Sequence, residues 1–489
     1  MFHFVANLKP YTIDPESKRS HFGSYLLSVD YASGLRALVQ HVHEEHRILA
    51  ADNGNFDRIG TLLNKLTASA IPLAEARKRE EVALGHYARP GELSTSLREL
   101  YASFAKEIAE HAAAARREDQ VQSVVTAQLA MRPSYLIGME DFTIPLMVGL
   151  GVERAYASLP MSFFTKAADR AIAYGRETQD STFGSCNANV FAGLHAVDFD
   201  TARAIGKRAG AAKMEGIAVG LGSALDDRDF TDYRIEHGKV VPLGASVPRP
   251  YVRVLEVAAG LHLGFADATG RRPRFHALGA GTPILLPLLA VLGDQGTYTA
   301  TDSTAPIKDA YSSTTIAVYV DRPAPLKLKA YVVIQRWLDG TFHWDCSCPH
   351  CVAFVKDYPF KIEKAKAWWI GEGKRPLTPT DLWAPSPLAE HVPLLAMPKN
   401  PAVRKRAGLA RIAHNHWILR RLEAAIRRRN RTGEQLRDWV ETVVEKYVEA
   451  GSGTAWKTAT KAAWSIACSA AKQLEDADPG GEVSPTRPL

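Results

Sequence analysis

Three cysteines in one short run could hold a metal ion. Cys346, Cys348 and Cys351 lie in the sequence Trp-Asp-Cys-Ser-Cys-Pro-His-Cys. Thiolates at this spacing can cover one face of a tetrahedral ion, whereas a disulfide between two of them would leave the third idle. The spacing therefore predicts a structural zinc site, with a cluster of reactive or idle thiols as the alternative.

A Cys₃His zinc site needs one further ligand. We expect His414 to supply it, because this residue stands immediately ahead of an arginine-rich helical stretch. His391 and His416 stay open as alternatives, since the spacing from the cysteines to His414 is long. A histidine so distant in the chain would let the ion join two separate segments.

The arginine-rich stretch could bind phosphate groups. The net charge of +7 is modest for 489 residues, but basic residues crowd positions 404–431, where only Glu423 opposes them. Such a patch is typical of a nucleic-acid-binding surface, and a solvated helix face is the alternative. The residues predicted to contact nucleic acid are Arg420, Arg421, Arg427, Arg428 and Arg429.

Short apolar runs that alternate with helical patterns indicate how these residues are positioned. Each run ends in glycine or a polar residue, as parallel strands buried on both faces do. Six such units over about 300 residues favour a (β/α)₈ (TIM) barrel over an open sheet. The runs are 47–52, 135–140, 188–193, 216–220, 275–279 and 297–302.

The strand ends of such a barrel carry its chemistry. This rule selects five candidates, although an aspartate at a strand end can also cap a helix or close a turn. They are Asp52, Glu140, Gly220, Gly279 and Asp302.

Three regions are expected along the chain. The barrel occupies 1–335, with an Ala/Glu/Arg-rich helical insertion at about 84–130. A zinc-binding subdomain with the basic helix follows over 336–431, and its prolines predict mostly loop between the cysteines and His414. Residues 432–489 form a helical extension that ends in a disordered tail.

Composition excludes several protein classes. With 46% hydrophobic and 23% charged residues, the chain is typical of a soluble globular protein. It has no run of the roughly 18 to 20 apolar residues that a membrane span needs. The first residues lack the features of a secretion signal, and the few cysteines suit a reducing compartment. We therefore expect a cytoplasmic location.

Four motifs, taken together, resemble those of the tRNA-guanine transglycosylase family. The segment 52–56, Asp-Asn-Gly-Asn-Phe, resembles the family's Asp-Ser-Gly-Gly-(Phe/Tyr), and 278–283, Leu-Gly-Ala-Gly-Thr-Pro, resembles Met-Gly-Val-Gly-Thr-Pro. Residues 298–303 fall where the family carries its nucleophile. The cysteine cluster followed by His414 and a basic helix is similar to the family's zinc signature. The resemblance covers about 45–430.

The resemblance implies base exchange through a covalent Asp–sugar intermediate. Asp302 becomes the nucleophile and Asp52 the general acid and base, as in a retaining glycosidase. Phe56 and Leu278 would sandwich the base, and a carboxylate from Glu140 or Asp141 would meet its edge, with the inward-facing one left open. The backbone at Gly220 and Leu221 would read the base substituent, and Gly279 is a further substrate-binding position.

Departures from the family pattern indicate a divergent branch. Ser303-Thr304-Ala305 stands where the family usually has Pro-Thr-Arg. The chain is therefore similar to the DpdA-type enzymes that place deazaguanine bases in DNA, and DNA is the favoured substrate. The target base must leave its stack. The alternatives are a tRNA-guanine transglycosylase of queuosine or archaeosine type, a free nucleoside enzyme, and a non-catalytic zinc-containing nucleic-acid-binding subunit.

The sequence leaves some partners open. A homodimer and accessory DNA-processing proteins are both open as partners of the chain.

Overall fold

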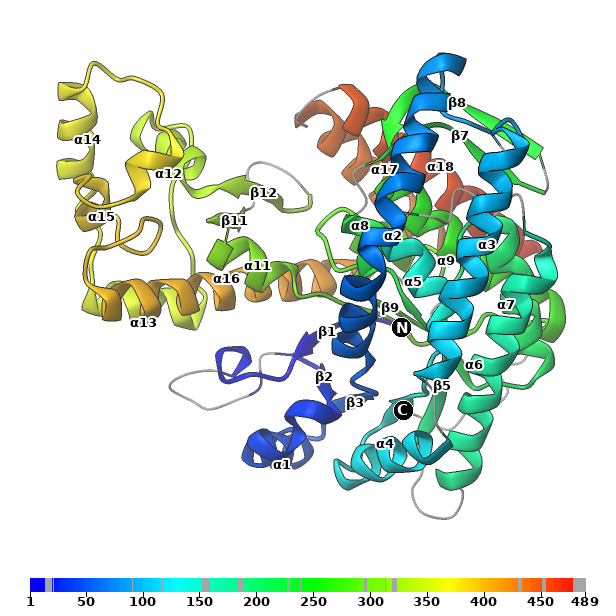
Figure 1. Cartoon of the computed structure of the whole chain (residues 1–489). Helices are drawn as coiled ribbons and strands as arrows, with labels where there is room; N and C mark the ends of the chain where they lie inside the picture. The colour runs from blue at the N-terminus through cyan, green and yellow to red at the C-terminus, as the bar shows by residue number, and fades with distance from the viewer. Residues whose placement is uncertain are drawn as a thin grey trace.

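Eight parallel strands close into a barrel in the computed structural model (Figure 1). Every neighbouring pair is parallel, and chain order is kept around the ring. The predicted (β/α)₈ fold is confirmed. The strands are β1 (Phe2–Asn7), β2 (Ser24–Ser28), β3 (Ile48–Asp52), β4 (Tyr135–Ile137), β5 (Asn189–Leu194), β6 (Gly216–Gly220), β9 (Arg274–Leu278) and β10 (Thr299–Asp302).

The structure describes most of the chain. The described residues are 1–13, 20, 22–89, 91–115, 118–151, 159–182, 188–226, 229–237, 239–293, 297–312, 314–318, 323–429, 433–450 and 454–477.

The strands form because alternate residues fill two different cores. In β1, Phe4 and Ala6 pack outward against the surrounding helices, whereas Val5 points into the barrel interior. The interior cluster also contains Tyr135 and Tyr298. Strands buried on both faces read as continuous apolar runs, which is the pattern that the sequence shows.

Helices cover the outside of the barrel between successive strands. Among the described residues, those that follow or precede barrel strands are α1 (Arg36–Glu44), α5 (Thr143–Gly149), α6 (Met161–Thr182), α7 (Phe199–Ala211), α8 (Gly222–Asp226), α9 (Arg249–Thr269), α10 (Leu285–Ala290) and α11 (Ala305–Ser312). Short 3₁₀ turns lie at η1 (Pro10–Thr12), η2 (Val29–Leu35) and η4 (Pro379–Leu382).

Two insertions interrupt the β/α alternation. Three helices lie between β3 and β4, namely α2 (Asn55–Leu84), α3 (Thr95–Ala114) and α4 (Glu118–Ala130). The helical insertion therefore begins earlier than the predicted 84. An antiparallel hairpin, β7 (Phe230–Glu236) and β8 (Lys239–Pro248), lies between β6 and α9, where the sequence analysis expected no strands.

A second unit with its own hydrophobic core projects from the barrel on the left of Figure 1. Its core runs from Ile316 to Ala410, so it begins before the predicted boundary at 336. The predicted loop over 352–410 contains several helices. The elements are β11 (Thr315–Val318), β12 (Leu326–Lys329), α12 (Ala330–Leu338), α13 (Pro349–Asp357), α14 (Ile362–Gly371), α15 (Leu388–His391) and the first half of α16 (Pro401–Arg429).

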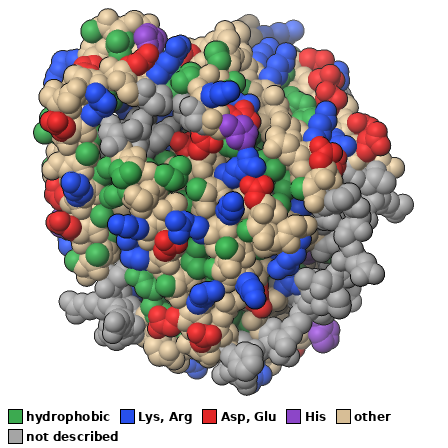
Figure 2. All heavy atoms as spheres, turned by 90° about the vertical axis from the view of Figure 1, so that its right-hand side faces the viewer, with side chains coloured by type: hydrophobic (Ala, Val, Ile, Leu, Met, Phe, Trp, Pro, Cys, Tyr) green, Lys and Arg blue, Asp and Glu red, His purple; other side chains and the backbone are tan. Residues whose placement is uncertain are grey.

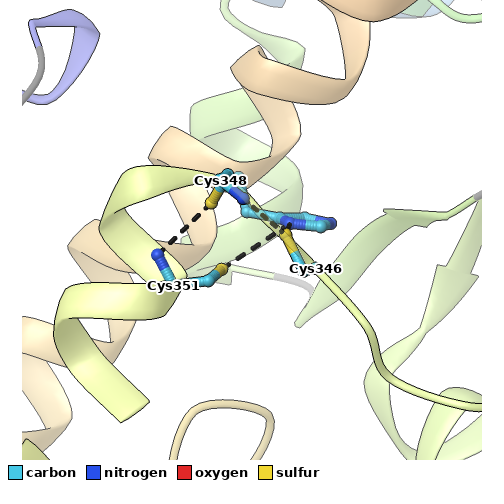
Figure 3. Close-up of side chains that lie close together, drawn as sticks. Cys346, Cys348 and Cys351 are labelled. Carbon is cyan, nitrogen blue, oxygen red and sulfur yellow. Dashed lines mark hydrogen bonds between the residues drawn. The ribbon is translucent and has the colours of Figure 1, made fainter. Parts of the chain in front are cut away.

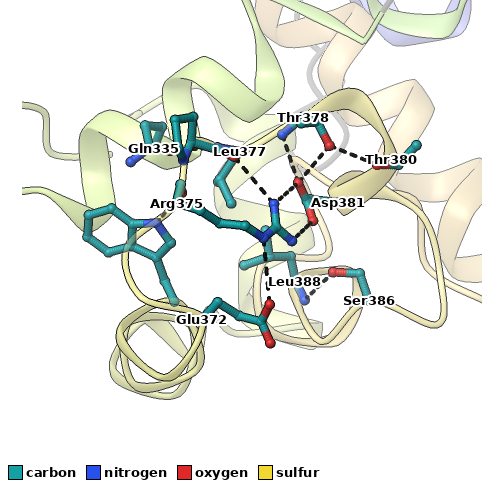
Figure 4. A network of polar contacts seen from close by, with 11 residues as sticks. Gln335, Glu372, Arg375, Leu377, Thr378, Thr380, Asp381, Ser386 and Leu388 are labelled. Atoms are coloured by element: carbon teal, nitrogen blue, oxygen red, sulfur yellow. Dashed lines mark hydrogen bonds and ion pairs between the residues drawn. The ribbon is translucent and has the colours of Figure 1, made fainter.

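An arginine–aspartate pair holds the connection after α14 in this unit (Figure 4). Arg375 donates from Nη1 and Nη2 to the two carboxylate oxygens of Asp381, at 2.9 and 2.6 Å. Asp381 also accepts the backbone N–H of Thr378 at 2.7 Å. The Arg375 guanidinium lowers the pKa of Asp381 to about 2, so the pair stays ionised at neutral pH.

The C-terminal helices belong to the barrel. α17 (Gly433–Ala450) and α18 (Thr454–Ala477) share its outer core through residues such as Val440 and Ala467. The tail from 478, which the sequence analysis expected to be disordered, lies outside the described residues. Within the described part of the chain, no helix has both the length and the apolar character that a membrane crossing requires.

The face on the right of Figure 1 carries no block of charge of one sign. Figure 2 shows its described positive and negative side chains interspersed. Ion pairs also join neighbouring helices, such as Arg208 of α7 with Asp169 of α6 at 2.9 Å and Arg203 of α7 with Asp267 of α9 at 2.8 Å.

Candidate active site and metal centre

Two aspartates meet at one end of the barrel. Asp52 is the last residue of β3 and Asp302 the last residue of β10. Because all eight strands are parallel, both residues lie at the carboxyl-terminal rim. Strands β1 and β2 lie between β3 and β10 in the ring, so the two side chains come from different parts of the rim.

The surroundings of Asp52 favour its protonated form. Burial raises the pKa of the Asp52 carboxyl to about 7, and the charge of Glu140 adds to this shift. The backbone N–H of Asn53 lowers the pKa, while the charges of Asp302 and Asp30 raise it again. These interactions show that the four carboxyl groups share one electrostatic environment at the rim.

Asp302 is held through one of its two carboxylate oxygens. The Gly279 backbone N–H donates to Oδ1 at 3.1 Å, and His276 Nε2 lies 3.2 Å from the same atom. Among the described residues, no hydrogen bond or ion pair reaches Oδ2. Only 6% of Asp302 is exposed. Among the described residues, the carboxylate is therefore held through Oδ1 alone.

A glutamate–histidine pair lines the rim beside Asp52. Glu140 Oε2 lies 2.6 Å from His195 Nε2, and both side chains are largely buried. A Cβ at Gly220 would approach His195 Cε1 to 2.5 Å, so the imidazole packs directly on this glycine. A Cβ at Gly193 would come within 2.7 Å of the Gly138 carbonyl oxygen. Glycine at 193 and 220 thus makes room for the pair.

The two adjacent carboxylates at 140 and 141 point in different directions. Asp141 accepts the Thr143 backbone N–H at 2.9 Å and the Arg170 Nε–H at 2.7 Å. It therefore caps the start of α5 and ties it to α6. Of the two candidates for contact with a base, Glu140 is the one that faces Asp52 and His195.

The other predicted substrate positions lie at the same rim. Leu278 ends β9, and Gly279 adopts a positive φ of 77° as it turns toward Asp302. The Leu221 backbone N–H donates to the Leu278 carbonyl at 2.9 Å, so this amide is not free to bind a ligand. Phe56 lies in the first turn of α2, and its side chain is outside the described residues.

The arginine-rich helix does not join the aspartates. Arg427 contacts Glu423 at 3.5 Å and the sulfur of Met1 at 3.0 Å, and Arg429 lies over the Trp439 ring. Met1 precedes β1, so this part of α16 lies at the amino-terminal end of the strands, opposite Asp52 and Asp302. Arg420 lies over the Trp417 ring, and Arg421 and Arg428 are exposed on the same helix.

Four side chains in the second unit form a compact cluster. The ligand atoms of Cys346, Cys348, Cys351 and His414 all lie within 4.8 Å of one another. Figure 3 shows the three cysteine side chains turned toward one another. The backbone N–H groups of Cys348 and Cys351 donate to the sulfurs of Cys346 and Cys348, each at 3.3 Å. Such donors stabilise thiolates.

The orientation of His414 suits a metal ligand. Its Nε2 lies 2.9 Å from the Ala317 carbonyl oxygen, which can only accept, so Nε2 carries the proton. The bare Nδ1 then faces Cys346 Sγ at 3.0 Å and Cys351 Sγ at 3.6 Å. A tetrahedral zinc ion separates its ligand atoms by roughly 3.5–3.8 Å, which this cluster can match with small shifts.

The alternative histidines do not belong to the cluster. The Nδ1 of His416 lies 2.9 Å from the Ile412 carbonyl oxygen, and its ring packs on Phe4 and Phe22. His391 is also absent from the cluster. The four side chains could therefore hold a metal ion, with His414 as the fourth ligand.

The sequence matches no protein-family model and has no significant match among curated proteins.

Proposed function

We propose that the chain is a base-exchange transglycosylase that replaces guanine in a polynucleotide with a 7-deazaguanine base. The observation that carries this proposal is the placement of Asp52 and Asp302 on separate strands at one barrel rim. Their environments differ, since the pKa of Asp52 is raised to about 7 while Asp302 is held by a backbone N–H. Such a difference separates an acid from a nucleophile. The motif resemblance supports the same roles.

The first half of the reaction removes guanine. Oδ2 of Asp302 attacks C1′ of the nucleotide, and the C1′–N9 bond breaks with its electron pair going to the base. Asp52 donates its proton to a ring nitrogen of the leaving guanine and becomes ionised. The sugar, still within the polynucleotide, is now bonded to Asp302.

The second half attaches the new base. The ionised Asp52 takes the N9 proton of the incoming deazaguanine, and N9 attacks C1′. The bond between C1′ and Asp302 breaks, with its electron pair returning to the carboxylate. Both aspartates end in their starting forms, so no external oxidant or energy source is needed.

Glu140 and His195 fit the edge of a guanine-like base. The N1–H and N2–H₂ groups of guanine are donors, and a carboxylate such as Glu140 accepts from both. His195, held 2.6 Å from Glu140, fixes the direction of that carboxylate. A 7-deazaguanine keeps the same edge, so the one site serves both bases.

DNA is the favoured polynucleotide. The support is the set of motif departures, above all Ser303-Thr304-Ala305 after the proposed nucleophile. The target nucleotide must be flipped or single-stranded to reach a barrel rim. Phosphates around that nucleotide would meet residues of the rim, because Arg427 and Arg429 lie at the other end of the barrel.

Zinc is the proposed ion of the Cys₃His cluster. Three sulfurs and one imidazole nitrogen are the donor set that tetrahedral zinc prefers in structural sites. The cluster provides no free position for a reactant, and it lies in a different core from the aspartates. Its role would be to hold the second unit together.

Incorporation of labelled base tests the proposal. Purified protein is incubated with radiolabelled guanine and either duplex DNA, single-stranded DNA or total tRNA. We expect label in DNA, and a loss of at least roughly 10³-fold in rate for Asp302→Asn. Asp169→Asn, an exposed aspartate of α6 paired with Arg208, serves as the matched control and should exchange at the wild-type rate.

Other outcomes contradict parts of the proposal. Label in tRNA alone would make the chain a tRNA transglycosylase. Full activity in Asp302→Asn would remove the nucleophile assigned here. No incorporation into any nucleic acid would favour a binding subunit.

A further inference from the structure

We propose that His276 is a positioning residue that holds Oδ1 of Asp302 and leaves Oδ2 as the attacking atom. The inference rests on the proposed function and deepens it. His276 lies in the middle of β9, and none of its surface is exposed. It was not among the residues that the sequence analysis selected.

A polar chain runs from Asp302 into the barrel interior through His276. Its Nε2 lies 3.2 Å from Asp302 Oδ1, and its Nδ1 lies 2.9 Å from the hydroxyl of Tyr135. The Tyr135 hydroxyl in turn lies 3.2 Å from that of Tyr298. All of these groups are buried among apolar side chains of the interior cluster.

A hydrogen bond donated by Tyr135 would fix which imidazole nitrogen carries the proton. Burial raises the pKa of Tyr135 well above its usual value, so the phenol keeps its proton. If Tyr135 donates to Nδ1 of His276, Nε2 must be protonated and faces Asp302 as a donor. The opposite tautomer would place a lone pair 3.2 Å from Oδ1 and repel the carboxylate.

Two donors then converge on the same oxygen. The Gly279 N–H lies 3.1 Å from Oδ1, and His276 approaches the same atom from within the barrel. The His276 Nε2–H is not yet in line for a hydrogen bond, since Nε2 has no such partner among the described side chains and backbone. A small rotation of the carboxylate completes the bond as Oδ2 moves to C1′.

The apolar surroundings argue against a purely space-filling role. Neighbouring interior positions hold Phe191, Ala218 and Ala300. An aliphatic side chain at 276 would fill the same volume without the cost of burying polar nitrogens. A contact with Asp302 would offset the cost of burying the imidazole.

The test compares three variants with the wild type in the labelled-base assay. His276→Leu removes the donor, and His276→Gln keeps an N–H at nearly the same place. Tyr135→Phe removes the hydroxyl that would fix the tautomer of His276. We expect His276→Leu to lower kcat on the order of 10²-fold with KM unchanged, because a misplaced nucleophile slows the chemical step only. His276→Gln should recover most of the rate, and Tyr135→Phe should fall between.

A matched control separates positioning from packing. His262 of α9 is equally buried, and its ring packs on Phe275, the neighbour of His276, without touching Asp302. His262→Leu should keep the wild-type kcat. Gel analysis of trapped protein–nucleic-acid adduct in a single turnover gives a second readout, with slower adduct formation expected for His276→Leu.

The outcomes distinguish this inference from the proposed function. An active wild type that loses activity in Asp302→Asn but not in His276→Leu overturns the positioning role alone. So does an equal loss in His262→Leu. If His276→Leu does not fold, an unchanged kcat in Tyr135→Phe overturns the role instead. A wild type that exchanges no base overturns both.

Discussion

The two rim aspartates are chemically identical, and their surroundings make them different. Asp52 sits among other carboxyl groups, so burial and like charges favour its neutral form. Asp302 instead receives the Gly279 N–H on Oδ1. The two carboxyl groups therefore suit different roles within the proposed site.

The raised pKa of Asp52 predicts a pH-dependent gain in stability for Asp52→Asn. The pKa moves from 3.8 to about 7 on folding, so the folded state binds the proton more tightly and stability falls as pH rises through this window. Asparagine carries no such penalty. Between pH 5 and pH 8.5 the stability of the variant relative to the wild type should therefore rise, by at most roughly 3 kcal/mol.

Chemical denaturation at the two pH values measures this difference. Asp169→Asn, whose wild-type carboxylate is exposed, serves as the matched control. A relative stability that does not rise between the two pH values would contradict the buried, charge-crowded environment of Asp52.

Some site residues could be predicted from sequence and others could not. Asp52 and Asp302 end apolar runs, and that position alone marks a barrel rim. His195 also follows a strand, but its significance lies in Glu140 and Gly220, which are distant in the chain. His276 stands inside a strand, where a histidine looks like any core residue until the fold brings Asp302 beside it.

At the scale of elements, α16 serves two environments along one helix. Its middle carries His414 to the cysteine cluster, and its last turns bring Glu423 to within 3.8 Å of His3 at the start of β1. Burial raises the pKa of Glu423 to about 7, and the charge of Arg427 opposes this shift. The arginines thus compensate a buried acid at the end of the barrel away from the rim.

This placement predicts a stability effect for the arginines. Replacing Arg427, Arg428 and Arg429 together by glutamine should destabilise the protein by about 1–2 kcal/mol, since Glu423 loses a neighbouring cation. The KM for polynucleotide should stay within about twofold of wild type. Thermal melting and the labelled-base assay measure the two quantities. Intact stability with a large rise in KM would instead identify this helix end as the phosphate-binding surface.

The sequence pattern predicted most of the barrel strands but not all of them. Six were predicted from buried runs bounded by helices, and all six are barrel strands. β1 and β2 were missed because β1 is followed by the 3₁₀ turn η1 and no α-helix, and because η2 separates β2 from α1. The β7–β8 hairpin was missed because its residues are largely exposed and carry no continuous apolar run.

At the scale of the whole molecule, the protein has two main hydrophobic cores. One spans the barrel and the C-terminal helices, and the other belongs to the unit over 316–410. The three cysteines of the Cys₃His cluster lie in or against the second core, and His414 reaches them from α16. A metal ion there would stabilise one core directly and the other only through α16.

This division predicts a two-step response to metal removal. The wild type should hold about one equivalent of zinc by elemental analysis, and a strong chelator should unfold the unit over 316–410 first. Hydrogen exchange would then rise in α13 and α14 before it rises in the barrel strands. Cys348→Ser should behave like chelated protein, whereas His391→Ala should keep its zinc. A metal-free wild type that melts as a single unit would refute the site.

The path of α16 limits how the barrel could be produced without the second unit. A truncation anywhere in the second unit would discard the later turns of this helix, which cover β1 and neutralise part of the charge near Glu423. A shortened gene would have to delete the segment between α11 and the middle of α16. It would then join α11 directly to α16 near His416. The same restriction applies in evolution. The second unit could be exchanged only as an insert between α11 and the later turns of α16, because both of these must stay in place.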